Sequence, residues 1–333
     1  MVSDDCGGAG MSLSGGHILV TGAAGLIGRN LIEHLCSLGL GSRAVVHRRQ
    51  PAARLPHVDY VTADLTNAQD CARAMQGIDH VFHCAAVVIG ASATAADPAA
   101  AVAECAAINA NVIEAAFRAH VKKFLWLGST TAYPPAGDRP LREEEILDGQ
   151  PFEKYRAVGG MNRQMEILCR HYGRQALPPM TTIVLRPTNV YGPGDNFDPA
   201  KSRVAAALLR RVVERTDPFE VWGTGDDIRD MIYVDDVVRA MVLAMEKLDR
   251  YTTLNIGSGK GHSVSEMLQI LLELEGFTPS RLVFDAGKPS MIPVRRVDVS
   301  KAQRELGFVA EIDLPEGFRR TLQWYKQNRA LAP

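Results

Sequence analysis

The sequence lacks the features that mark membrane, secreted and nucleic-acid-binding proteins. Its apolar runs fall short of the ~20 residues that a helix needs to cross a bilayer. It carries 37 Lys and Arg residues against 38 Asp and Glu residues, and a formal net charge of −1 offers a polyanion no general attraction. Residues 1–15 are acidic and glycine-rich and lack the apolar segment of a secretory signal, so we expect a disordered tail there. We therefore expect neither a membrane nor a nucleic-acid partner.

The sequence also lacks paired cysteines and metal-binding clusters. Its six cysteines, at positions 6, 36, 71, 84, 105 and 169, show no paired spacing and lie mostly in apolar segments. This pattern predicts reduced thiols that pack as small hydrophobic side chains, as in a cytoplasmic protein. The histidines do not gather with cysteines or carboxylates at ligand spacing, so we expect no metal site.

What the sequence does contain is a regular alternation of short apolar stretches with amphipathic ones. The stretch HILVTGAAGLIGRNLIEHLCSLG, residues 17–39, predicts a strand, a glycine turn and a helix. Further strands are expected within 42–49, 58–65, 79–86, 122–133 and 180–194. Strands that alternate with helices predict an α/β fold with a Rossmann-type doubly wound parallel sheet.

The length of 333 residues exceeds the usual size of one domain, and the alternation loosens after about residue 190. We expect a Rossmann domain over 16–190, with returning segments near 225–260, and a smaller α/β lobe mainly over 191–333. Ser263 and Glu266 predict a capping box at a helix start in the lobe, and Ser300 with Gln303 gives a similar signal. The lobe should lie over the carboxyl edge of the sheet, where doubly wound folds bind ligands.

The glycine turn is the most informative motif. Gly22, Gly25 and Gly28 follow a strand and precede a helix that opens with Leu26 and Ile27. In this context the first glycine permits a tight turn, the second lets a pyrophosphate approach the backbone, and the third allows close helix–strand packing. The free N–H groups of the helix start favour the phosphates, so we expect a dinucleotide cofactor here.

The end of the second strand indicates which dinucleotide binds. An NAD site usually carries an acid there for the ribose hydroxyl, whereas this chain has His47, Arg48 and Arg49. A guanidinium pairs with a 2′-phosphate in fork geometry, so Arg48 favours NADP over NAD. The alternative is that these arginines are solvated loop charges.

Several longer stretches together resemble the extended short-chain dehydrogenases, in particular the NAD(P)-dependent nucleotide-sugar epimerase/dehydratase family. They include TGAAGLIG (21–28), LGSTTAYP (127–134), LRPTNVYGPGDNFDP (185–199), VWGTGDDIRDMIYVDD (221–236) and LNIGSGKGHSVSEM (254–267). Within that family, the second and third stretches are most similar to GDP-fucose synthase-like members. The resemblance implies a nucleotide-diphosphate sugar as substrate.

The resemblance also implies roles for individual residues. The cofactor would contact Asp64, Leu65, Ala85, Ala86, Asn109 and Pro187 in addition to the glycine turn and Arg48. Ser129 matches the family's catalytic Ser/Thr, and Thr130 and Thr131 lie close enough in sequence to assist. The nucleotide-sugar would contact Asn189, Lys201, Arg203, Val204, Leu208, Trp222, Arg229 and Arg295. A diphosphate needs Arg or Lys partners, and a base is commonly held by an aromatic wall. The alternative is that Trp222 is a core side chain and that Arg229 is an ion-pair partner.

The family's Tyr-x-x-x-Lys motif is degenerate in this chain. The alignment puts Val158 in the tyrosine position and Asn162 in the lysine position. Without a cation to lower its pKa, a tyrosine is only about one part in a thousand phenolate at pH 7. Tyr155 lies seven residues before Asn162 and so on nearly the same helical face, and Gly159-Gly160 favours a distorted helix start that brings it nearer. Asn162 can still donate a hydrogen bond to a ribose; the alternative for Tyr155 is a packing or interface role.

A second departure concerns the histidine acid that GDP-fucose synthase-like proteins carry after YGP. Gly194 occupies that position, and Asp195 and Asp198 are the nearest acids. Epimerisation of the ring carbons needs an acid/base pair on the sugar, so the loss of the histidine puts that specific activity in doubt.

Three functions remain open from the sequence. The first is an NAD(P)-dependent nucleotide-sugar epimerase or reductase that transfers hydride at a sugar carbon, with Ser129 and Tyr155 handling the proton. The second is a catalytically degenerate protein that binds a nucleotide-sugar and NADP, and the third is an atypical nucleotide-sugar dehydratase or decarboxylase. The resemblance further implies a homodimer formed by the helices expected within 103–120 and 161–172.

Overall fold

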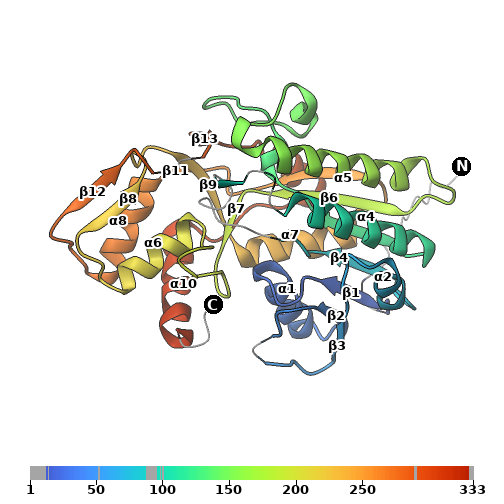
Figure 1. Cartoon of the computed structure of the whole chain (residues 1–333). Helices are drawn as coiled ribbons and strands as arrows, with labels where there is room; N and C mark the ends of the chain where they lie inside the picture. The colour runs from blue at the N-terminus through green and yellow to red at the C-terminus, as the bar shows by residue number, and fades with distance from the viewer. Residues whose placement is uncertain are drawn as a thin grey trace, which may run out of the picture.

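The computed structural model describes residues 13, 15–51, 53–87, 96, 97, 99, 101–288 and 291–329. Its centre is a seven-stranded sheet with strand order β10-β6-β5-β4-β1-β2-β3, in which every neighbouring pair is parallel (Figure 1). The strands are β1 (Ile18–Thr21), β2 (Ser42–Val46), β3 (Val58–Thr62), β4 (His80–His83), β5 (Lys123–Leu127), β6 (Thr181–Pro187) and β10 (Thr252–Ile256). The predicted α/β, doubly wound class is confirmed, and the strand order reverses between β1 and β4, where such folds bind ligands.

Helices cover both faces of this sheet because each buries one apolar stripe. On one face lie α1 (Leu26–Ser37), α7 (Val234–Lys247) and α9 (Ser300–Leu306). On the other lie α2 (Ala68–Ala74), α4 (Val102–Arg118) and α5 (Arg156–Arg174). Each face has its own buried cluster of Ile, Leu, Val and Ala side chains, as expected for strands covered on both sides.

The smaller lobe packs around a third apolar cluster beyond the carboxyl edge of the sheet. Its helices are α6 (Val204–Val213), α8 (Val264–Glu275) and α10 (Leu314–Asn328). A four-stranded sheet contains β7 (Asn189–Tyr191), β9 (Ile228–Tyr233), β11 (Gly261–Ser263) and β13 (Val294–Arg295). A separate parallel pair joins β8 (Phe219–Trp222) to β12 (Leu282–Asp285). In Figure 1, α6, α8, β8 and β12 lie together at one end of the molecule, away from β1, β2 and β3.

The two helix starts predicted from capping-box patterns were only partly correct. The capping box at α8 is confirmed: the N–H of Glu266 donates to Ser263 Oγ at 3.0 Å, and the N–H of Ser263 donates to Glu266 Oε2 at 2.7 Å. The similar signal at Ser300 is wrong, because Ser300 is already the first residue of α9. Its N–H donates to Asp298 Oδ1 at 2.8 Å.

The tail expected over 1–15 falls almost entirely on residues outside the described part of the chain, since 1–12 and 14 are not described. Leu13 is described and lies in the core at 1% exposure. Among the described helices, none is long and apolar enough to cross a membrane. The described residues also contain no group of three or more His, Cys, Asp or Glu side chains that could hold a metal ion.

Candidate functional site

The glycine turn between β1 and α1 has the geometry that phosphate binding requires. Gly22 has a φ of +67°, and a Cβ there would lie 2.8 Å from the backbone of Ala85. A Cβ on Gly28 would lie 2.3 Å from the carbonyl oxygen of Gly22, so only glycine lets α1 pack this closely. Gly25 caps α1, and no side chain of the described residues hydrogen-bonds to this helix start. Its free N–H groups are therefore available to an anion.

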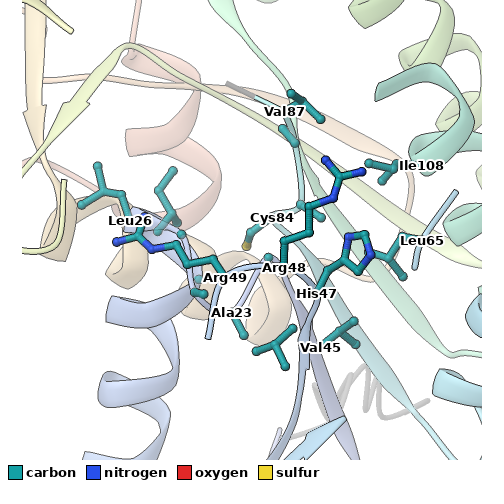
Figure 2. Close-up of a pocket in the computed structure, with 18 of the residues that line it drawn as sticks. Ala23, Leu26, Val45, His47, Arg48, Arg49, Leu65, Cys84, Val87 and Ile108 are labelled. Carbon is teal, nitrogen blue, oxygen red and sulfur yellow. The ribbon is translucent and has the colours of Figure 1, made fainter. Parts of the chain in front are cut away.

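A cavity of 460 Å³ opens beside this turn, between the ends of β1, β2 and β4 (Figure 2). Of the residues predicted to bind the cofactor, those that line it are Gly22, Gly25, Leu26, Ile27, Gly28, Arg48, Asp64, Leu65, Ala85 and Ala86. The cavity lies at the point where the strand order reverses and is lined by glycine backbone, apolar side chains and cations. This donor set fits a dinucleotide.

Two arginines at the end of β2 project into the cavity in different directions. Figure 2 shows Arg48 reaching towards Val87 and Ile108, and Arg49 reaching towards Leu26. Arg48 Nη2 lies 4.0 Å from Glu104 Oε1, but its side chain is 80% exposed, so this ion pair contributes little stability. Burial lowers the pKa of Arg49, and the positive charge of Arg29 lowers it further. An anion bound between these side chains would relieve the repulsion.

Asn109 is placed one step back from the cavity, in a buried hydrogen-bond chain. Thr21 Oγ1 accepts from the N–H groups of Cys84 and Ala85, both at 3.1 Å, so its own hydroxyl donates to His83 Nδ1 at 2.7 Å. His83 Nε2 then donates to Asn109 Oδ1 at 3.0 Å. Burial lowers the pKa of His83 to about 4, so the ring is neutral. Asn109 therefore acts as a positioning residue for the β4 loop.

The predicted catalytic side chains form a second hydrogen-bond chain. Asn162 Nδ2 donates to Thr131 Oγ1 at 3.1 Å, and Thr131 Oγ1 donates to Ser129 Oγ at 2.9 Å. The N–H of Thr131 also donates to Ser129 Oγ, at 3.2 Å. Ser129 thus accepts twice within the protein, and its own proton is left for an outside acceptor. Thr130 is buried and supplies its carbonyl to the N–H of Tyr133.

Tyr155 is not part of the hydrogen-bond chain formed by Asn162, Thr131 and Ser129. It caps α5, which begins at Arg156 and continues through Gly159 and Gly160 without opening, so the predicted distortion is wrong. Gly159 instead allows α5 to approach the catalytic loop, because a Cβ there would lie 2.6 Å from the carbonyl oxygen of Thr131. Burial raises the pKa of the Tyr155 phenol, and the positive charges of Arg229 and Arg295 oppose that shift. Both arginines are therefore close enough to act electrostatically on Tyr155.

Arg229 and Arg295 are direct neighbours on parallel strands β9 and β13. Both are buried, at 9% and 4% exposure. Arg229 Nη2 donates to Asp227 Oδ2 at 2.9 Å, whereas Arg295 donates to the carbonyl oxygens of Tyr133 and Pro134. Arg295 Nε has no hydrogen-bond partner within the described residues, and burial lowers the pKa of this guanidinium to about 10. Like charges directly opposite on a sheet are unfavourable, so an anion placed between the two guanidinium groups would offset their repulsion.

The structure distributes the other predicted substrate residues differently. Lys201 and Arg203 line the cavity at the glycine turn rather than the region of Arg229. Leu208 is 5% exposed in the lobe core, and Val204 packs against that core. Asn189 Nδ2 donates to the carbonyl oxygen of Asp230 at 3.0 Å.

Trp222 and Pro187 are in contrasting environments. Trp222 is 45% exposed at the end of β8 and carries the ammonium of Lys288 at 5.9 Å from its ring, so it is not core. Pro187 is buried as the last residue of β6.

Comparison with known proteins shows the family of this chain. The profile described as "NAD dependent epimerase/dehydratase family" matches residues 18–257. The chain belongs to this family. It is 33% identical over 323 residues to "Probable GDP-L-fucose synthase 1" of Oryza sativa subsp. japonica, covering 94% of this chain and 93% of that one. It is 34% identical over 271 residues to "GDP-L-fucose synthase" of Escherichia coli (strain K12), covering 77% and 83%. The solved UDP-glucose 4-epimerase of Thermotoga maritima, in complex with UDP-glucose, has a TM-score of 0.83 at 26% identity and covers 94% of this chain and 99% of that one.

A buried polar network around Arg186, which the sequence did not predict, supports the site. Arg186, at 1% exposure, donates from Nε and Nη2 to the two carboxylate oxygens of Glu166 at 2.7 and 2.6 Å. The same guanidinium contacts the hydroxyl of Tyr133, which donates to Asn255 Oδ1 at 2.7 Å. This buried network ties α5, β6, β10 and the catalytic loop together. The sequence signals for this network were Glu166, four residues after Asn162, and the dipeptide Arg186-Pro187 at the end of β6.

Proposed function

We propose that the protein is an NADP-dependent nucleotide-sugar epimerase or reductase that acts at a sugar carbon. The observation that carries this proposal is the buried pair of Arg229 and Arg295, which face each other on neighbouring strands. One carboxylate, that of Asp227, is hydrogen-bonded to Arg229. A diphosphate would pair with both guanidinium groups and satisfy Arg295 Nε. The relatives named for GDP-L-fucose synthesis and the relative solved with UDP-glucose favour a nucleotide-diphosphate sugar as the source of that diphosphate.

Cofactor chemistry follows from the first cavity. A bound nicotinamide dinucleotide supplies hydride exchange with a sugar carbon. The glycine turn would hold its pyrophosphate, and the apolar wall of Leu65, Ala85 and Ala86 would exclude water from the rings. Arg48 and Arg49, with no acid at the end of β2, favour a 2′-phosphate and hence NADP.

Proton handling is assigned to two groups. Ser129, polarised by the hydrogen bonds from Thr131, donates its free proton to the reacting sugar oxygen. Tyr155 stays a neutral phenol at pH 7 because burial raises its pKa, so it serves as a proton donor rather than a base. Asn162 holds Thr131 in place and offers no charge. Gly194 has no side chain, so position 194 supplies no acid for ring epimerisation.

A second candidate is a protein that binds both ligands without turnover. The observation that favours it is the replacement of the family's tyrosine and lysine by Val158 and Asn162, with Asn162 already engaged by Thr131. Under either reading we propose a cytoplasmic protein. We also propose a homodimer through the outer faces of α4 and α5, where Ala103, Ala106, Ala110, Gly160 and Ile167 are exposed.

The test is a substrate panel. Purified protein is incubated with NADPH or NADH and with GDP-, UDP- and dTDP-sugars, including 4-keto-6-deoxy forms, and products are followed by mass spectrometry and NMR. We expect turnover of at least one sugar, with a loss of at least 100-fold in Ser129→Ala and a smaller loss in Tyr155→Phe. Arg295→Ala should weaken sugar-nucleotide binding and leave dinucleotide binding unchanged. Binding of both ligands without turnover in any combination would favour the second candidate.

A further inference from the structure

The lobe contributes a wall to the dinucleotide cavity. The loop of residues 192–203, which we call the lobe loop, connects β7 to α6. Gly194, Asp195, Asn196, Lys201 and Arg203 of this loop line the same cavity as the glycine turn. Since β7 and α6 belong to the lobe, one ligand in this cavity would contact both halves of the molecule.

The lobe loop is fastened directly to the helix that follows the glycine turn. Asn30 of α1, at 9% exposure, donates from Nδ2 to the carbonyl oxygen of Pro193 at 2.9 Å and to that of Leu26 at 2.7 Å. A Cβ on Gly194 would lie 3.5 Å from Arg29 Cδ, which shows how closely the loop approaches α1. The start of the loop is therefore held beside the phosphate-binding end of that helix.

A second contact holds the middle of the loop. Phe197, at 2% exposure, packs against Trp324 and Tyr325 of α10 with ring-centroid distances of 6.1 and 4.3 Å. The Trp324 ring also carries the guanidinium of Arg29 at 5.6 Å. The loop is thus packed between α1 and α10, and its position relative to the glycine turn is set by buried groups.

The charges on this wall suit a phosphate. Asp195 is 3% exposed, and its Oδ1 accepts from Arg203 Nη2 at 3.1 Å. This hydrogen bond directs the Arg203 side chain, which remains 42% exposed, and leaves its other N–H groups available. Lys201 Nζ lies 4.0 Å from Asp198 Oδ2 and is 63% exposed, so that ion pair holds it weakly. Arg49 also lines this cavity, and the positive charge of Arg29 acts on it.

We propose that Arg203 and Lys201 bind the pyrophosphate of the dinucleotide from the side facing the glycine turn, and that Asp195 is the positioning residue for Arg203. This assignment rests on the dinucleotide of the proposed function and moves both cations from the substrate to the cofactor. The glycine turn supplies backbone N–H groups to one side of the pyrophosphate, and the lobe loop supplies cations to the other.

The experiment measures binding rather than turnover. The full chain is titrated with NADPH, NADH and GDP by calorimetry, as wild type and as Arg203→Ala, Arg203→Lys, Lys201→Ala and Arg48→Ala. Arg118→Ala, an exposed arginine of α4 paired with Glu114, is the matched control. We expect Arg203→Ala to weaken NADPH and NADH by the same factor, at least tenfold, because both share the pyrophosphate. Arg203→Lys should recover part of this loss, and Arg48→Ala should weaken NADPH far more than NADH.

The outcomes separate this proposal from the function on which it rests. Failure of the wild-type chain to bind either dinucleotide overturns both. If wild type binds and folded Arg203→Ala keeps its NADPH affinity within twofold, the pyrophosphate role is excluded while the proposed function stands. Loss of GDP affinity in Arg203→Ala, measured without dinucleotide, would return Arg203 to the substrate site.

Discussion

At the residue scale, Asn162, Thr131 and Ser129 form a hydrogen-bond chain that contains no charged side chain. The family's lysine position holds Asn162, whose amide donates to Thr131 and can neither carry charge nor pass on a proton. The direction of the chain, from Asn162 through Thr131 to Ser129, favours donation to a carbonyl or alkoxide oxygen. Among the described residues of this hydrogen-bond chain, none is a base that could remove a proton from a sugar hydroxyl.

The first prediction restores the missing pair. In Val158→Tyr/Asn162→Lys, the lysine cation should lower the pKa of the new tyrosine and give it a base function. We expect kcat for a sugar that the wild type turns over to rise at least tenfold, with a new ionisation below pH 10 in the kcat profile. Asn162→Lys alone is the control, because it adds the charge without the phenol. A folded double variant with unchanged kcat would show that the reaction does not use this position.

The second prediction concerns His83. Its pKa is about 4 in the folded chain against 6.5 as the ordinary value, because burial disfavours the imidazolium. The folded state therefore binds fewer protons than the unfolded state between these two values. The stability that the neutral ring contributes is complete above pH 6.5 and is lost as the pH falls to 4. At about 1.4 kcal/mol per pH unit, the loss amounts to about 3 kcal/mol.

Urea unfolding between pH 7 and 4 measures this loss. His83→Gln keeps a donor and an acceptor but does not titrate, so its free energy of unfolding should fall less steeply over that interval. Parallel pH profiles for the two chains would contradict the assignment of the buried neutral ring.

At the element scale, the sequence predicted six of the seven strands of the main sheet but missed β10, and not all predicted helix starts were correct. The glycine turn, the β-branched stretches and the Ser263 capping box are local signals, and their physics is complete within a few residues. The pair Gly159-Gly160 is not a local signal of this kind. Both glycines have the same helix propensity, and only their tertiary contacts distinguish their roles. Gly159 faces the catalytic loop, and Gly160 faces open space. No sequence pattern holds that information.

The third prediction uses this neighbouring pair. A Cβ on Gly160 meets no described atom within 4 Å, so Gly160→Ala should raise the free energy of unfolding by about 0.5–1 kcal/mol. A Cβ on Gly159 would lie 2.6 Å from Thr131 O and 2.8 Å from Pro151 Cβ. Gly159→Ala should therefore destabilise the chain and displace Thr131, which lowers kcat. Thermal unfolding and turnover of the two variants, prepared side by side, test both halves. Equal effects of the two substitutions would contradict the close approach of α5.

At the scale of the whole molecule, the two halves are interleaved rather than consecutive. After the first lobe elements, the chain returns to the main sheet with α7 and β10, and α9 packs on the same face. The domain boundaries expected from the sequence include returning segments near 225–260. The assignment of Lys201 and Arg203 to the cofactor cavity was not, because their place depends on Asn30 and Phe197, which carry no motif. Contacts between distant segments decide the site, and a single sequence gives little information about them.

The last prediction follows from this interleaving. A chain ending at residue 190 would lose β10, which pairs with β6 along Thr252–Ile256, and would leave that sheet edge open. It would also lose α7 and the Asn255 partner of the buried Tyr133 hydroxyl. We expect this fragment to be unfolded by circular dichroism, while the complete chain unfolds in one calorimetric transition. NADPH at a concentration of 100 Kd should raise the free energy of unfolding of the complete chain by about 2.7 kcal/mol. The single transition should move to higher temperature without splitting, because the dinucleotide cavity includes residues from both halves. Two separate transitions, with only the earlier or later one shifted by NADPH, would show instead that the lobe folds independently of the sheet.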